Sequence, residues 1–189
     1  MGILSALLGR TRLKDPDREG FFSIVNAAFD LRGRTDLRIL NEAGLVMNPA
    51  ESDYFDNLDA ELRQLPELSG RATGTRFEIT DDDFGTRWVV LDDPDFEDLV
   101  STIHLISETV ADHGFANRLL AAAFSFEFQR RDVYWIYNYK SGKFHPFIAS
   151  GERERDNATE LRLGEVMKEQ RLPVERRLER WYALWGIPF

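Results

Sequence analysis

The stretch LLAAAFSFEFQRRDVYWIYNYKSGKFHPFIA, residues 119–149, contains two turns and three runs in which apolar and polar side chains alternate. A repeat of two residues is typical of a strand with one buried face. Ser141-Gly142 has the form of a two-residue hairpin turn. Pro146 cannot donate a ladder hydrogen bond, so the third run fits the edge of a sheet or ends early. This stretch therefore predicts three consecutive antiparallel strands.

Helical and strand patterns alternate before this stretch. Apolar residues recur at helical spacing three times, and Pro66 and Gly114 end the second and third of these helices. A short strand follows the first helix, and a hairpin turns at residues 81–85. The predicted elements are a helix over residues 21–29, a strand over 44–47, a helix over 54–65, a hairpin pairing 76–80 with 86–91, and a long helix from Pro94 to Gly114.

Two further helices are predicted after the three strands. Asn157 fits the N-cap of the first, with Glu160 three residues on and Asp156 offsetting the helix dipole. That helix should run to about Gln170. Pro173 then predicts the start of a last helix. Its shared apolar face would comprise Leu178, Trp181, Tyr182 and Trp185.

This order of elements predicts the α+β class. Short turns join most strands, which favours a mainly antiparallel sheet of about five to six strands, covered by helices on one face. The rhythm is similar to that of the type III secretion chaperone-like fold. We expect an N-terminal amphipathic segment and linker over residues 1–19, followed by one α+β domain over residues 20–189.

The composition narrows the functional classes. Hydrophobic residues make up 43% of the 189 residues and aromatic residues 12%, which is enough for a packed core. The net charge of -9 argues against a nucleic-acid binder, which normally has a basic face. The chain has no cysteine, no signal peptide pattern and no apolar run long enough to span a bilayer. We therefore expect a cytoplasmic protein.

The first ten residues form a separate amphipathic pattern. Ile3, Leu4, Leu7 and Leu8 fall on one helical face, and Arg10 and Arg12 follow. One interpretation is a short helix that docks on the domain. The other is a segment that contacts the inner surface of the cell membrane.

No catalytic spacing stands out in the chain. Gly-x-Ser-x-Gly, a Gly-rich phosphate loop and His-Glu-x-x-His are all missing. The acidic run at residues 81–83 fits a solvated turn better than a cation site. His104, His113 and His145 have no partner at ligand spacing. We therefore expect no catalytic residue, no cofactor and no metal.

The candidate binding residues lie in the last third of the chain. Lys140, Lys143, Arg153 and Arg155 would form a local basic rim beside aromatic side chains. Such a rim could receive an acidic helix or lipid headgroups. Trp181 and Trp185 are predicted first as core residues and second as interface anchors. The full candidate set is Tyr139, Lys140, Lys143, Phe144, Arg153, Arg155, Trp181 and Trp185, with Asp156, Asn157 and Glu160 as structural caps.

Short motifs occur in an ordered series over nearly the whole chain. They are Met1-Gly2-Ile3-Leu4, Ala6-Leu7-Leu8-Gly9-Arg10, Trp88-Val89-Val90, Asp93-Pro94-Asp95, Leu99-Val100, His104, Gly114-Phe115, Leu119-Leu120, Tyr139-Lys140, Phe144, Pro146-Phe147, Arg155-Asp156-Asn157, Glu160-Leu161, Leu172-Pro173-Val174-Glu175, Arg180-Trp181 and Trp185-Gly186. This series resembles the PspA-associated protein PspAB family, accessory proteins of phage-shock-type envelope-stress systems. Residues 51–75 match the family pattern least.

The resemblance implies association with PspA, a coiled-coil protein that protects damaged membranes, and implies no reaction or catalytic residues. We therefore expect a non-enzymatic adaptor that accepts a helix or an extended segment of a PspA-like partner. The alternatives are a chaperone-like binder of client segments, which would form a homodimer, and a peripheral membrane protein. An enzyme remains the least favoured alternative.

Overall fold

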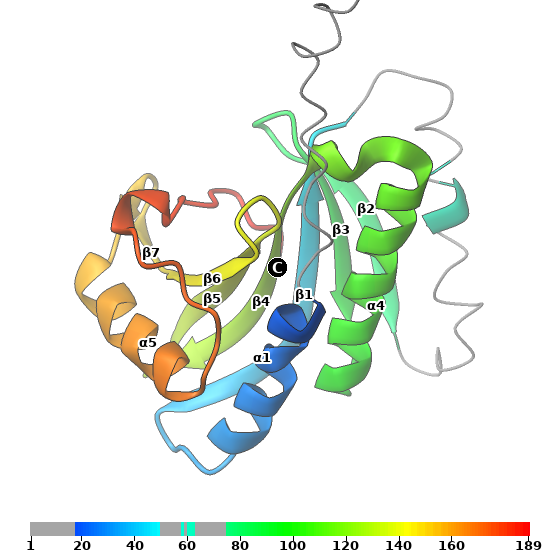
Figure 1. The fold of residues 1–189 in the computed structure, drawn as a ribbon. Coiled ribbons are helices and arrows are strands. Elements are labelled where there is room, and N and C mark those ends of the chain that lie inside the picture. Colours follow the sequence, from blue (N-terminus) through cyan, green and yellow to red (C-terminus); the bar gives the residue numbers. More distant parts are fainter. Residues whose placement is uncertain (1–17, 50–57, 59, 63–74) are drawn as a thin grey trace, which may run out of the picture.

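The alternating runs of the sequence assemble into one antiparallel sheet (Figure 1). The computed structural model describes residues 18–49, 58, 60–62 and 75–189. Six strands pair in the order β2-β3-β1-β4-β5-β6, and two short strands form a separate ribbon. The strands are β1 (Leu37–Met47), β2 (Arg76–Asp81), β3 (Arg87–Asp92), β4 (Leu119–Phe128), β5 (Arg131–Asn138), β6 (Lys143–Phe147), β7 (Ala149–Gly151) and β8 (Glu154–Arg155).

The register of the strands separates two faces of the sheet. Ala122 pairs with Tyr137 across β4 and β5, and both face the helices. The next pair, Ala123 and Ile136, faces the opposite side because successive side chains alternate. We call these the inner face and the outer face. Both faces carry buried apolar residues at the centre of the sheet.

Three helices pack on the inner face (Figure 1). They are α1 (Arg18–Leu31), α4 (Phe96–Val110) and α5 (Asn157–Glu169). Asp95 caps α4, because its carboxylate accepts hydrogen bonds from the backbone N–H groups of Glu97 and Asp98. A π-helical turn, η1 (Ala111–Phe115), continues α4 until Gly114, where φ is 86°. None of the helices in the described part of the chain combines the length and apolar character that a membrane span requires.

The predicted last helix does not form. Residues 172–175 run beside β6 instead, where Phe144 N–H donates to Pro173 O (2.8 Å) and Glu175 N–H donates to Phe144 O (2.8 Å). One short turn, η3 (Leu178–Arg180), follows, and the rest of the chain crosses the outer face. The predicted helix would place Trp181 and Trp185 on one face. This prediction was wrong, because Trp181 packs in the inner core whereas Trp185 packs on the outer face. The sheet is therefore covered on both faces and not on one.

Other predictions were confirmed or need small corrections. The α+β class, the hairpin at residues 81–85, the long helix and the edge position of β6 are confirmed. β1 begins at Leu37, seven residues before the predicted strand, because a bulge between Ile39 and Ala43 interrupts its alternation. The N-cap of α5 is Asp156, which accepts from Thr159 N–H (3.0 Å), and not Asn157.

Two predicted segments lie largely or wholly outside the described residues. They are the N-terminal amphipathic segment and most of the helix predicted over residues 54–65. Of the latter, Leu58 and Leu62 are described and fully buried. The domain boundary at residue 19 stays a prediction.

A first prediction concerns Gly164 on α5. A Cβ added there would lie 2.6 Å from the Trp181 ring, so Gly164→Ala must displace a buried indole. Overpacking costs about 1–3 kcal/mol, partly offset by about 1 kcal/mol of helix propensity. We expect a net loss of about 1 kcal/mol in the free energy of unfolding, measured by urea titration. Gly33→Ala is the matched control because nothing lies within 4 Å of its added Cβ. Equal stability of the two variants would contradict the packing argument.

Candidate functional site

The end of the chain forms a strap over the outer face of the sheet. We define the strap as residues 182–189. Its apolar side chains pack on a floor of six buried residues, and Phe189 and Trp185 make ring contacts with Trp88 (6.1 Å) and Phe147 (5.2 Å). Gly44 provides the seat for Phe189, because a Cβ at Gly44 would lie 2.6 Å from that ring. The floor comprises Val46, Trp88, Ala121, Ala123, Ile136 and Phe147.

Two side chains hold the ends of the strap. His145 Nε2 donates to the carbonyl oxygen of Tyr182 (3.0 Å), and the Tyr134 hydroxyl donates to the backbone oxygen of Phe189 (2.7 Å). Within the described ranges, these are the hydrogen bonds that join the strap to the sheet. The strap is therefore attached mainly by apolar contact and does not continue the strand ladder.

A buried ion pair fixes the chain just before the strap. Arg155 donates twice to the Glu160 carboxylate, at 3.1 and 2.8 Å, and Glu160 also accepts from Ile148 N–H (2.9 Å). The Arg155 guanidinium donates in addition to the backbone oxygen of Trp181. The Trp181 indole donates to Glu175 O (2.9 Å). This clasp joins α5, β8 and the segment that leads into the strap.

A cationic surface lies where the strap begins. A pocket of about 210 Å³ is lined by Lys140, Arg180 and Tyr182, together with Asn138, Ser141 and Glu175. The Arg180 guanidinium lies 3.9 Å from the Glu175 carboxylate, so Lys140 and Lys143 supply the net positive charge of this region. Lys140 is exposed, and Tyr182 keeps 58% of its surface exposed. Lys143 stands opposite Asn138, another residue of the lining. We call Lys140, Lys143, Arg180 and Tyr182 the cationic surface; it lies on a protein of net charge -9.

The outer face is acidic beyond the other end of the strap. Glu42 stands directly opposite Asp92 on β1 and β3, and Glu127 stands opposite Asp132 on β4 and β5. Like charges in such positions repel each other. Burial, with smaller effects from Asp132 and Glu42, raises the pKa of Tyr134 to about 12. These four carboxylates form an acidic border beside the Tyr134 anchor of the strap. Arg38 pairs with Glu127 (3.2 Å) and Arg76 pairs with Asp92 (3.7 Å), so Glu42 and Asp132 carry the net negative charge of the border.

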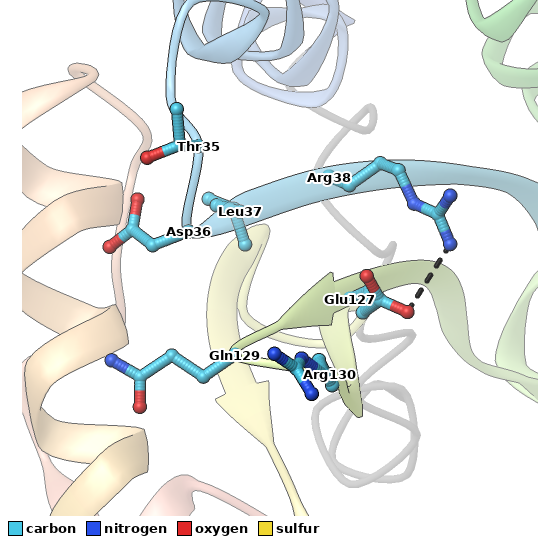
Figure 2. Close-up of a pocket in the computed structure, with 7 residues that line it drawn as sticks. All are labelled: Thr35, Asp36, Leu37, Arg38, Glu127, Gln129 and Arg130. Carbon is cyan, nitrogen blue, oxygen red and sulfur yellow. Dashed lines mark hydrogen bonds and ion pairs between the residues drawn. The ribbon is translucent and has the colours of Figure 1, made fainter.

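A second pocket opens at the start of β1 and at the β4–β5 hairpin (Figure 2). Its volume is about 550 Å³. Arg38 pairs with Glu127 (3.2 Å), and the neighbouring Arg34 pairs with Asp36 (2.9 Å), which lowers the pKa of Asp36. Gln129 N–H donates to Asp36 O and fixes the hairpin turn against this strand. Since these charges satisfy one another, the pocket presents a balanced polar surface.

The predicted binding residues separate into exposed and buried groups. Lys140 and Lys143 are exposed and lie close together at the β5–β6 turn, whereas Arg153 is exposed in the turn between β7 and β8. Trp185 is half-buried in the strap. Tyr139 is half-buried, and burial raises the pKa of its hydroxyl group. Phe144 and Trp181 are buried core residues, whereas Arg155 is partly buried, with 20% of its side chain exposed, and belongs to the clasp.

Sequence reasoning missed several residues of this region. Arg180 and Gly44 carried no assigned role, and Tyr182 was placed on a helix that does not exist. One signal was present, because a glycine inside an apolar strand often marks the close approach of another group. Gly44 has that position in β1 and receives Phe189.

The titratable residues of the structure do not converge on one point. His104 pairs with Glu108 (3.2 Å), His113 pairs with Glu61 (3.0 Å), and His145 holds the strap. The described residues contain no group of three or more His, Cys, Asp or Glu placed to hold a metal ion. Asp82, in the acidic turn, accepts hydrogen bonds from Thr86 N–H and from the Trp88 indole, so its role in the turn is structural.

Comparison with known proteins gives one family match. The model of the family PspAB, PspA associated protein B, matches residues 1–189, the whole chain. No curated protein and no solved structure matches the chain. The family resemblance of the sequence is confirmed, and the similarity to the type III secretion chaperone-like fold stays a prediction.

A second prediction tests the clasp. Glu160→Gln keeps the size of the side chain and an acceptor for Ile148 N–H, but it leaves the Arg155 guanidinium without its counterion. Removing one partner of a buried pair costs about 3–5 kcal/mol, so we expect a loss of about 3 kcal/mol in urea unfolding. Glu165→Gln is the control, because Glu165 forms an exposed pair with Lys168 whose loss should cost less than about 1 kcal/mol. A loss at Glu160 no larger than that of the control would reject the clasp.

A third prediction concerns pH. Burial lowers the pKa of His145 to about 4, against about 6.5 in an unfolded chain. Between these values the unfolded chain binds more protons than the folded chain, so stability falls as the pH falls. From pH 7 to pH 5, His145 should remove about 2 kcal/mol from the free energy of unfolding.

The comparison variant for this pH effect is His145→Gln, whose amide can still donate to Tyr182 O. Its stability should fall by about 2 kcal/mol less than that of the wild type over the same pH interval. Urea unfolding at both pH values measures the difference. If the free energy of unfolding falls equally in the wild type and in His145→Gln, the folded protein does not hold His145 neutral.

Proposed function

Since the chain belongs to the PspAB family, we propose that it is a non-enzymatic cytoplasmic adaptor that binds a PspA-like coiled-coil protein. The observation that carries the proposal is the family match over all 189 residues, since the family is described by its association with PspA. The docking site we propose is the cationic surface, formed by Lys140, Lys143, Arg180 and Tyr182.

The chemistry of this surface supports the choice. Coiled-coil helices carry charged residues, often Glu and Lys, along the borders of their apolar seam. Acidic residues of such a border would pair with Lys140 and Arg180, and opposite charges guide both encounter and register. Tyr182 and Leu178 are 58% and 54% exposed, respectively, and offer apolar area beside these charges. Aromatic residues next to arginine are frequent centres of binding energy.

A fourth prediction tests this site directly. The double variant Lys140→Glu/Arg180→Glu should bind the PspA-like protein of the same organism about tenfold more weakly or worse, equivalent to about 1.4 kcal/mol, because two attractive pairs become repulsive. Titration calorimetry on the two purified proteins measures the affinity. The melting temperature should change little for Lys140→Glu alone, since Lys140 is exposed, whereas Arg180→Glu also places a second carboxylate beside Glu175.

Arg162→Glu supplies the matched control. Arg162 is exposed on α5, a helix that packs on the inner face of the sheet. This variant should bind like the wild type. Unchanged affinity of the double variant would reject the site, and failure of the wild-type protein to bind would reject the adaptor function itself.

A further inference from the structure

We propose that the strap is an exchangeable occupant of the outer face, and that an amphipathic helix of the PspA-like partner replaces it on the floor. This inference rests on the proposed function and adds a second contact to it. The strap begins at Tyr182, inside the cationic surface, so a partner bound there lies beside the residues that it would displace.

The burial of the two layers is unequal. Floor residues Val46, Trp88, Ile136 and Phe147 are at most 2% exposed, whereas Trp185, Ile187 and Phe189 of the strap are only half-buried. The floor therefore needs a cover, and the strap supplies one with only part of its own surface. A bare apolar face of this kind would be unfavourable in water, so release requires another apolar segment to take its place.

The strap is attached to the sheet by side-chain hydrogen bonds and apolar contacts, without a backbone ladder. Residues 172–175 exchange two backbone hydrogen bonds with Phe144, whereas the strap is held at its ends by His145 and Tyr134. Segments with few hydrogen bonds and partial burial open more readily than the strands beneath them. The strap can therefore leave while the sheet stays folded.

The charges around the floor define what would replace the strap. The cationic surface lies at one end, and the acidic border lies at the other, where Glu42 and Asp132 carry the net negative charge because arginines pair with Asp92 and Glu127. The complementary partner is a helix with an apolar stripe, acidic residues near one end and basic residues near the other. An apolar helix face in an apolar groove is a recurrent mode of peptide recognition. Anionic lipid would be repelled by the acidic border, which favours a protein segment.

Competition by the strap has a measurable consequence. When the binding-competent form is only a fraction of the population, the apparent affinity falls by that fraction. Phe189→Ala removes the ring that fills the Gly44 seat, so it should raise the open fraction and tighten partner binding about tenfold. Glu42→Lys should weaken binding about fivefold by reversing one charge of the acidic border. Phe29→Ala is the control, because Phe29 is an exposed aromatic residue on α1, whose helix packs on the other face of the sheet.

A second measurement tests the exchange without Phe189→Ala, in case that variant misfolds. It uses a chemical label on the strap and leaves the rest of the strap sequence unchanged. The chain has no cysteine, so Ala183→Cys introduces a single thiol in the half-buried part of the strap. Partner binding should speed its reaction with a thiol reagent about tenfold. In the control Ala28→Cys, the thiol replaces a residue of α1 that is 2% exposed, so it should stay protected with and without partner.

The outcomes separate the two proposals. Faster labelling of the strap thiol with tighter binding of Phe189→Ala supports exchange. Partner binding with unchanged or slower labelling would overturn it and leave the adaptor function intact. Absence of binding by the wild-type protein would overturn both.

Discussion

A sheet with apolar residues on both faces must be covered on both. This constraint organises the whole chain. The inner face is filled by α1, α4 and α5, which leaves the floor around Trp88 and Ile136 without a helix. The strap covers that floor with extended chain, and Gly44 makes room for its last aromatic ring. The position of the chain end is therefore a consequence of hydrophobic burial and not of secondary-structure propensity.

The clasp at Arg155 connects the two coverings. Arg155 binds Glu160 on α5 and the backbone oxygen of Trp181, where the chain leaves the inner core and enters the strap. A charged pair is costly to bury, yet here it satisfies groups from α5 and the C-terminal segment at once. The strap thus begins at a hydrogen-bonded clasp, whereas the rest of it is held mainly by apolar contact.

The candidate site could be predicted only in part from the sequence. Lys140 and Lys143 were identified because a local turn places both near each other. Arg180 and Tyr182 were missed because their position depends on the path of the chain after Pro173. Phe144 and Trp181 stood in the candidate binding set, although Trp181 was predicted first as a core residue. Both are core residues, because β6 is flanked by residues 172–175 and because Gly164 receives the Trp181 ring.

The sequence by itself determined the strands, the long helix and the α+β class, since alternation, turns and caps act between residues close in the chain. Tertiary structure alone decided which face each aromatic residue of the last segment contacts. Trp181 and Trp185 are four residues apart and would share one side of a helix. They lie on different faces of the sheet because burial is decided by residues distant in sequence, namely Gly164 for the first and Phe147 for the second. No local pattern contains that information.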